Sequence, residues 1–115
     1  MTPVKARLLV ADDEPSIVSY LRDVLSEEGY SVTTASSGGA ACEAAEREQV
    51  HLALVDLKMP DMSGMEVMTR IRERMPSAQV IIMTAFGTVE TAVEAMKSGA
   101  LDYLIKPFSI DELKM

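Results

Sequence analysis

Five polar side chains that are suited to chemistry each stand at the end of an apolar run in this sequence. Asp12 and Asp13 follow LLVA, and Asp56 follows LALV. Thr84 follows VIIM, and Lys106 follows DYLI. Carboxylates, a hydroxyl and an ammonium group are the functional groups of metal-assisted phosphoryl transfer in which one carboxylate is the nucleophile. The set predicts such a site if the fold brings the five side chains together.

Three carboxylates in one place need a counter-charge. Two carboxylates about 4 Å apart repel by roughly 4 kcal/mol at an effective dielectric near 20, so three either take up protons or bind a cation. Oxygen ligands at a loop favour Mg²⁺ over Zn²⁺, and no His or Cys lies at metal-ligand spacing. Because Mg²⁺ works beside phosphate oxygens, Thr84 and Lys106 suit a phosphoryl group on Asp56.

The apolar runs that end at these residues alternate with helical patterns. The predicted strands are residues 7–11, 31–35, 51–55, 79–83 and 102–105. The predicted helices begin near residues 15, 37, 63, 89 and 109, and the last one is cut short at Met115. This (βα)₅ order predicts a parallel sheet with right-handed crossovers and helices on both faces.

The strand order follows from the one strand that carries no chemical group. The strand at 31–35 ends in Ala35-Ser36, which suits an edge position and predicts the order 2-1-3-4-5. The fold class is therefore α/β, a flavodoxin-like doubly wound sheet. Such sheets bind ligands beyond the carboxyl ends of the strands, where the strand order reverses. That point lies between the strands that end at Asp12 and Asp56.

Helical spacing also predicts which side chains form the core. The expected faces are Ile17, Leu21, Val24 and Leu25; Ala41, Ala44 and Ala45; Met68, Ile71 and Met75; and Val89, Val93 and Met96. Ser63 and Glu66 have the spacing of a capping box at a helix start. Phe86, Thr88 and Ala92 are candidates for a partner surface.

Composition sets further bounds. The 115 residues form one domain with a net charge of -7, which argues against binding of nucleic acid by this domain. No apolar run approaches 18 residues, so no membrane span is expected. The lone Cys42 reads as a buried small residue in a reducing cytoplasm, and His51 reads as structural.

The combination of Asp12-Asp13, Asp56, Thr84 and Lys106-Pro107 resembles the receiver domain of bacterial two-component response regulators. The segment DLKMPDMSG resembles the phosphorylation loop of that family, and the resemblance covers residues 7–113. The run AFGTVETAVEAMKSGALDYLIKPF is similar to receivers of the NtrC class, which control activators of the alternative nitrogen-type sigma factor.

The resemblance implies a role for each site residue. Asp56 is the expected phosphoacceptor. Asp13 and Asp56 are expected to bind Mg²⁺ through their side chains and Lys58 through its backbone carbonyl, with Asp12 contributing through water. Thr84 is expected to bond a phosphoryl oxygen, and Lys106 is expected to form an ion pair with it.

The same resemblance implies how a signal would leave the site. Tyr103 matches the switch aromatic, which turns inward as Thr84 moves. The Lys106-Pro107 bond is expected to be cis. Lys58 and Phe86 are expected to tune the lifetime of the phosphoryl group.

The implied partners are a sensor histidine kinase and an output domain in the same polypeptide. For the NtrC class that output comprises an ATPase and a DNA-binding domain, with a possible phosphorylation-dependent homodimer. The chain, residues 1–115, is then expected to be a fragment of a longer regulator. Its chemistry is self-phosphorylation and autodephosphorylation, so it is expected to signal rather than act as an enzyme.

Other readings stay open at this point. Asp12 and Asp13 taken alone suit helix-capping acids, and Tyr103 alone suits simple packing. A stand-alone receiver that acts through protein contacts is one alternative function. An aspartyl-nucleophile phosphatase is another, although DDEPS at 12–16 differs from its DxDxT signature. A nucleotide-binding fold would need glycines in the first turn, and a degenerate receiver would lack the complete acid, Thr and Lys set.

Overall fold

The computed structural model describes residues 6–108, so the predicted helix at 109–115 lies outside the described residues. Strands and helices alternate in the predicted order. Their bounds are β1 Arg7–Ala11, α1 Pro15–Glu27, β2 Ser31–Ala35, α2 Gly38–Arg47, β3 Leu52–Asp56, α3 Gly64–Arg74, β4 Gln79–Thr84, α4 Val89–Lys97 and β5 Asp102–Ile105.

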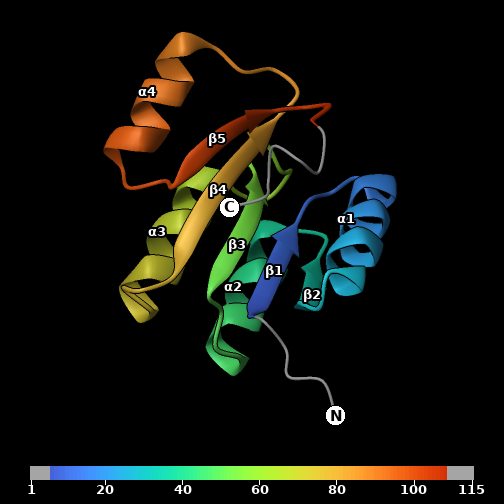
Figure 1. Ribbon diagram of the computed structural model, residues 1–115. Coiled ribbons are helices and arrows are strands. Elements are labelled where there is room, and N and C mark those ends of the chain that lie inside the picture. Colours follow the sequence, from blue (N-terminus) through green and yellow to red (C-terminus); the bar gives the residue numbers. More distant parts are fainter. Residues whose placement is uncertain (1–5, 109–115) are drawn as a thin grey trace.

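The strands of the described region form one parallel sheet in the order β2-β1-β3-β4-β5, as predicted. Their arrows point toward the same edge of the sheet in Figure 1. The order reverses at β1, because β2 lies on one side of it and β3 on the other. The loops after β1 and β3 therefore leave neighbouring strands at the edge where doubly wound sheets bind ligands.

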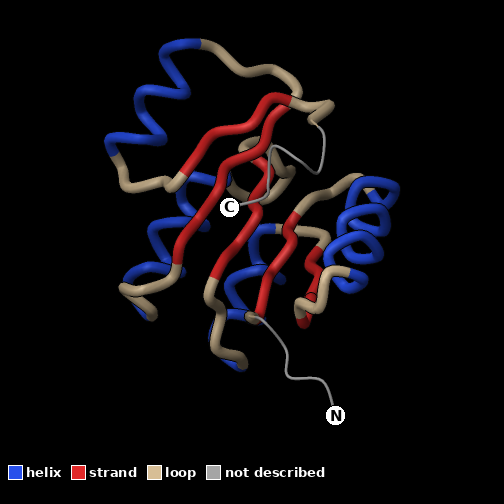
Figure 2. Tube along the Cα trace, viewed as in Figure 1, coloured by secondary structure: helices blue, strands red, loops and turns tan. Residues whose placement is uncertain are grey.

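Alternate side chains of the central strands enter two cores, one on each face of the sheet. Leu9 and Val80 belong to the core beneath α2, α3 and α4. Val10 and Met83 belong to the core beneath α1. Figure 2 shows the helices on both sides of the strands. Burial on both faces explains why these strands read as continuous apolar runs.

Most of the predicted core faces are confirmed. The buried side chains of α1, α2 and α3 include Leu21, Leu25, Ala41, Ala44, Ala45, Met68 and Ile71. Cys42 is half-buried instead of buried, because it lies beside the alanine face of α2 and packs at the margin of the core.

The prediction for α4 is wrong. Val89 is 81 % exposed, Val93 46 % and Met96 47 %, whereas Ala95 is fully buried. The physical reason is the position of the helix, which packs beside the edge strand β5 and not over the sheet centre (Figure 1). The helix therefore turns a small side chain to the body and leaves an apolar face uncovered.

Two strand boundaries also differ from the prediction. β3 runs from Leu52 to Asp56 and β4 ends at Thr84, one residue later than expected. His51 stands just before β3, where its ring Nδ1 accepts a hydrogen bond of 3.0 Å from the backbone N–H of Arg7. Because β3 and β4 each extend one residue further than predicted, Asp56 and Thr84 are the last residues of paired strands. Strand pairing fixes their backbone more firmly than a loop would.

The helix starts show one half-correct prediction and one missed cap. The Ser63 hydroxyl accepts from the Glu66 N–H at 3.3 Å, but the Glu66 carboxylate pairs with Arg70 at 2.9 Å. The complete capping box lies at α4, where Thr88 and Thr91 each accept from the other's backbone N–H at 3.1 Å. The sequence pattern missed it because Thr stands where Glu or Gln is usual.

Candidate functional site

The three acids of the sequence prediction meet at one point. One carboxylate oxygen each from Asp12, Asp13 and Asp56 lies within 4.8 Å of the other two. Asp12 is fully buried, Asp56 is 6 % exposed and Asp13 faces solvent. Asp12 is further fixed because its Oδ1 accepts from the Glu14 N–H at 3.0 Å. The cluster thus has two buried carboxylates and one that opens to water.

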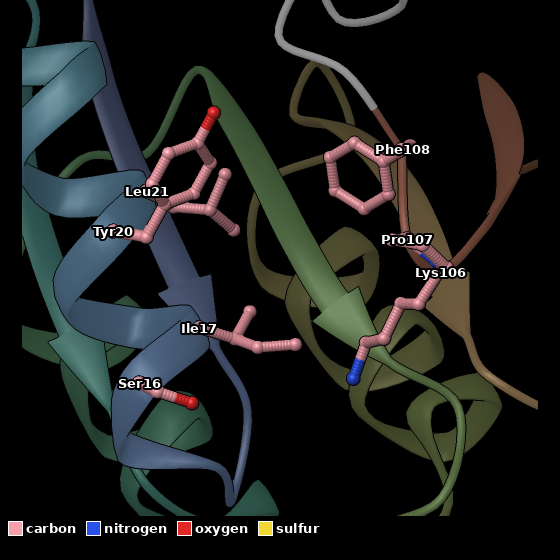
Figure 3. Close-up of a pocket in the computed structure, with 7 residues that line it drawn as sticks. All are labelled: Ser16, Ile17, Tyr20, Leu21, Lys106, Pro107 and Phe108. Carbon is pink, nitrogen blue, oxygen red and sulfur yellow. The ribbon is translucent and has the colours of Figure 1, made fainter.

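Lys106 reaches this cluster from the end of β5. Its Nζ lies 2.6 Å from Asp12 Oδ2 and 3.5 Å from Asp56 Oδ1. The bond to Pro107 is cis, as the resemblance implied. Lys106 lines a hollow of about 320 Å³ between α1 and Pro107-Phe108. Figure 3 shows its side chain running toward the end of β3. The ammonium group is therefore shared between two acids and stands beside the expected phosphoacceptor.

The surroundings of Asp56 and Lys106 shift the pKa values of both groups. Burial raises the pKa of Asp56 from its ordinary 3.8 to about 6, and repulsion from Asp12 adds to the effect. Burial alone would lower the pKa of Lys106, but its hydrogen bond to Asp12 and the charges of both acids outweigh burial and raise it. Three carboxylates and one ammonium leave an excess of negative charge, which a divalent cation with oxygen ligands would neutralise.

The donor set fits Mg²⁺ in kind. Asp12, Asp13 and Asp56 offer hard oxygen atoms from two adjacent strand ends, and the solvent-facing side chain of Asp13 leaves room for bound waters. The Lys58 carbonyl stays a predicted ligand. What the structure gives for Lys58 is its backbone N–H, whose proximity to the Asp56 carboxylate lowers the pKa of that group.

Thr84 ends β4, the strand next to β3, and is 1 % exposed. Its Oγ1 accepts a hydrogen bond of 3.1 Å from the Phe86 N–H, which leaves the hydroxyl proton available for another acceptor. Its carbonyl accepts from the Lys106 N–H at 2.8 Å. Thr84 is therefore joined by backbone to Lys106 and by side chain to the loop that leads into α4.

Lys58 and Phe86 meet at the mouth of the site. The Lys58 Nζ lies 5.6 Å from the centroid of the Phe86 ring, within the range of a cation–π contact. Both residues were expected to tune the phosphoryl lifetime, and that role stays a prediction. Their contact joins the loop after β3 to the loop after β4.

Tyr103 lies on β5 and contacts α4. Its hydroxyl is 2.6 Å from Thr91 Oγ1, and its ring lies so close to Gly87 that a Cβ there would be 3.0 Å from the hydroxyl oxygen. Tyr103 therefore packs against the loop that Thr84 leads into. The resemblance implied that Tyr103 is the switch aromatic, and that role stays a prediction. The sequence did not indicate Thr91 as its partner.

The sequence also gave no sign of a role for Asp61. This acid sits in the loop after Asp56 and accepts hydrogen bonds from Gly38 and Gly39 at the start of α2, at 2.9 and 2.8 Å. The two N–H groups, with Gly39 the stronger, lower the pKa of Asp61. The signal that could have found it is the glycine pair, since two adjacent glycines at a helix start allow close approach of another segment.

The sequence matches the response regulator receiver domain over residues 8–115, and the chain belongs to that family. It is 43% identical over 115 residues to the transcriptional regulatory protein ZraR of Klebsiella oxytoca. The aligned region covers 100% of this chain and 26% of ZraR. The chain thus spans about a quarter of the length of this curated relative.

Two solved structures make the likeness more specific. The beryllofluoride-activated NtrC4 receiver domain dimer has a TM-score of 0.87 and 40% identity, over 92% of this chain and 88% of that one. The response regulator TrrA of Thermotoga maritima, in complex with Mg²⁺ and beryllofluoride, has a TM-score of 0.82 and 36% identity, over 94% of this chain and 92% of TrrA. The flavodoxin-like fold and the likeness to NtrC-class receivers are both confirmed. Among residues 6–108, none of the helices has the length and apolar character to cross a membrane.

Proposed function

We propose that this receiver is a phosphorylation-dependent signalling switch in which Asp56 accepts a phosphoryl group from a sensor histidine kinase, with Mg²⁺ bound. The observation that carries the proposal is the position of Asp56 within 4.8 Å of two further acids and 3.5 Å of Lys106. In the transfer, the P–N bond of the donor histidine breaks and a P–O bond to Asp56 forms. The imidazole leaves with the bonding pair and takes up a proton.

The acids and the lysine have separate tasks in this proposal. Asp13 and Asp56 would hold Mg²⁺ with the Lys58 carbonyl, and Asp12 would support it through water. Mg²⁺ supplies neutralisation of the charge on the phosphoryl oxygens. Lys106 is already 3.5 Å from Asp56, so it can pair with a phosphoryl oxygen after a small movement away from Asp12.

The signal would leave the site through Thr84 and Lys106. A phosphoryl group adds roughly -1.5 to -2 charge at neutral pH, which attracts the Thr84 hydroxyl and the Lys106 ammonium. Movement of Thr84 would carry the Phe86 N–H with it, because the two are hydrogen-bonded at 3.1 Å. The loop before α4 would then shift, and Tyr103 would turn inward into the space that Thr84 leaves. This biases a pre-existing equilibrium between two arrangements of α4 and β5.

The uncovered apolar face of α4 suits the output step. Val89, Val93 and Met96 are exposed there, together with Ile105 at the end of β5, which is 49 % exposed. We propose that phosphorylation reshapes this face to form a homodimer or to contact an output domain in the same polypeptide, with ATPase and DNA-binding domains and a role in transcription. The acidic receiver itself would not bind nucleic acid, and it would work in the cytoplasm as a signalling domain that turns over no released substrate.

The direct test is chemical phosphorylation of the chain. Incubation with acetyl phosphate and Mg²⁺ should add one phosphoryl mass that is stable in acid and labile in base. The Asp56→Asn variant should show no such gain, and chelation of Mg²⁺ should abolish it in the wild type. An undiminished gain in the variant would show that another residue is the acceptor.

A further inference from the structure

The loop between β3 and α3, residues 57–63, is held both at its base and at its tip. At the base, the Gly64 N–H donates to the Leu57 carbonyl at 2.8 Å, and Lys58 and Ser63 form an isolated antiparallel bridge. At the tip, the Asp61 carboxylate bonds to α2, an element 22 to 23 positions away in the sequence. The loop that leads away from the proposed phosphoacceptor is therefore fixed to two different helices.

The tip contact uses both oxygens of one carboxylate. Asp61 Oδ1 accepts from the Gly38 N–H at 2.9 Å, and Oδ2 accepts from the Gly39 N–H at 2.8 Å. The next N–H group, of Ala40, donates to the Ser37 hydroxyl at 3.1 Å. Because the first N–H groups of a helix have no partner within it, Asp61 completes the first turn of α2. We call this pair of hydrogen bonds the Asp61 bridge.

The helix start is shaped to receive the loop. A Cβ on Gly38 would collide with the Met62 side chain, and a Cβ on Gly39 would lie 3.3 Å from Asp61 Oδ2. Neither glycine has a positive φ, so a backbone conformation that only glycine tolerates does not explain them. The missing side chains instead make space for residues 61 and 62, which is an observation independent of the hydrogen bonds.

The bridge matters for the site because the same loop carries Lys58. The backbone N–H of Lys58 lies close enough to the Asp56 carboxylate to lower its pKa, and the Lys58 carbonyl is the predicted third protein ligand of the cation. Lys58 is three positions from Asp61 and is paired with Ser63 on the far side of the tip. A displacement of the tip would therefore move both backbone groups of Lys58 relative to Asp56.

We propose that Asp61 is a positioning residue that holds the Lys58 backbone in place for cation binding and phosphoryl transfer at Asp56. This inference rests on the proposed function, since it assigns Asp61 to the same site. It predicts that breaking the Asp61 bridge weakens cation binding without removing any ligand. The Asp61→Asn variant breaks the bridge selectively, because an amide offers one acceptor oxygen and turns an N–H₂ group toward the second donor.

The test is a titration of the 115-residue chain with Mg²⁺ alone, followed through the backbone amide resonances of residues 56 and 58. We expect Asp61→Asn to raise the dissociation constant for Mg²⁺ about three- to tenfold, at or below the low end of the effects seen for groups that bond directly to metal ligands. The Gly38→Ala variant keeps every charge and pushes against Met62, and we expect a change in the same direction. The melting temperature of each variant is measured in parallel without Mg²⁺.

Glu66→Gln is the matched control, because it also removes one exposed carboxylate, in the first turn of α3 just after the loop, but leaves the loop tip untouched. The inference is supported if the dissociation constant for Mg²⁺ rises more in Asp61→Asn than in Glu66→Gln, and rises in Gly38→Ala as well. If Asp61→Asn and Glu66→Gln raise the Mg²⁺ dissociation constant equally, the effect is long-range electrostatics alone, and the inference is overturned. A lower melting temperature with an unchanged Mg²⁺ affinity makes Asp61 a helix cap alone, which also overturns it. Failure of the wild type to bind Mg²⁺ overturns the proposed function itself.

Discussion

The site at the carboxyl ends of the strands and the edge formed by α4 and β5 are built in opposite ways. At the site, charged groups are buried, with Asp12 fully covered and the side chain of Lys106 only 8 % exposed. At the edge, apolar groups are exposed, with Val89 81 % open to solvent. Buried charge and exposed apolar surface both work against stability, so each region is shaped by a requirement other than folding.

The two regions also differ in how firmly they are held. Asp12 and Asp56 extend from β1 and β3, which lie inside the sheet and are covered on both faces. α4 packs on the core through the single buried side chain of Ala95. Its side-chain hydrogen bonds lie near its two ends, in the Tyr103–Thr91 hydroxyl pair at 2.6 Å and in an Arg72 hydrogen bond of 2.8 Å to the Gly99 carbonyl. In the proposed switch, a change of charge at the firmly held site would therefore be expressed in the less firmly held α4, as expected for regions of low local stability.

The largest expected effect on stability comes from removal of the buried cation. Lys106→Met leaves Asp12 and Asp56 without their ammonium partner, and loss of one member of a buried pair costs about 3 kcal/mol or more. Urea unfolding without Mg²⁺ should show this loss in the free energy of unfolding. Lys97→Met, on the exposed last turn of α4, removes the same charge and should change stability by less than about 0.5 kcal/mol. Equal losses in the two variants would contradict the contrast between site and edge.

Neutralising Asp56 should have the opposite sign. Its pKa of about 6 lies above the ordinary 3.8, so the folded protein binds this proton more tightly than the unfolded chain does. The contribution of Asp56 to stability is therefore most favourable below about pH 4, falls as the pH rises to about 6, and is flat above that. At pH 7 we expect Asp56→Asn to be about 2 to 3 kcal/mol more stable than the wild type.

Urea unfolding in EDTA at a series of pH values measures this difference. The gap between the variant and the wild type should widen from pH 4 to pH 6 and then stay constant. Asp102→Asn, which removes an exposed carboxylate at the start of β5, is the matched control for loss of one negative charge. A constant gap across the whole range would mean that burial does not penalise the Asp56 charge.

The contrast between these regions also explains what the sequence could predict. Asp56 and Thr84 end their strands, and Asp12 and Lys106 directly follow theirs. Because parallel strands deliver their ends to one edge of the sheet, topology alone places these residues together. The exposure of α4 was not predictable in the same way. Helical spacing shows that Val89, Val93 and Met96 share a face, but it does not show which neighbour, if any, covers that face.

The Asp61 bridge and the Tyr103–Thr91 pair were missed for a related reason. Each joins a loop or helix start to an element distant in sequence, and neither follows from a periodic pattern. Side-chain contacts of this kind depend on the positions that loops and helix ends take in the folded protein. A sequence pattern can place a strand end at an edge of the sheet, but it does not place the tip of a loop against a helix.

The next effect in size concerns the attachment of α4. Tyr103→Phe removes the hydroxyl that bonds Thr91 but keeps the ring and the Thr88–Thr91 capping box. We expect a loss of about 1 kcal/mol in the free energy of unfolding and a different rate of phosphorylation by acetyl phosphate. Tyr20→Phe, on α1 and 50 % exposed, should change neither quantity. An unchanged rate in Tyr103→Phe would separate this hydroxyl from the switch.

The smallest effect on stability is expected on the apolar face of α4, where the effect on assembly should be large. Val93 is 46 % exposed, so Val93→Ser should alter the free energy of unfolding by less than about 0.5 kcal/mol. If this face forms the activated dimer, sedimentation with Mg²⁺ and beryllofluoride should show a weaker dimer for Val93→Ser than for the wild type. Tyr20→Ser, an exposed substitution on α1, should dimerise as the wild type does. Because Val93 contributes little to folding, a dimer unaffected by Val93→Ser would place the activated interface on another face of the receiver.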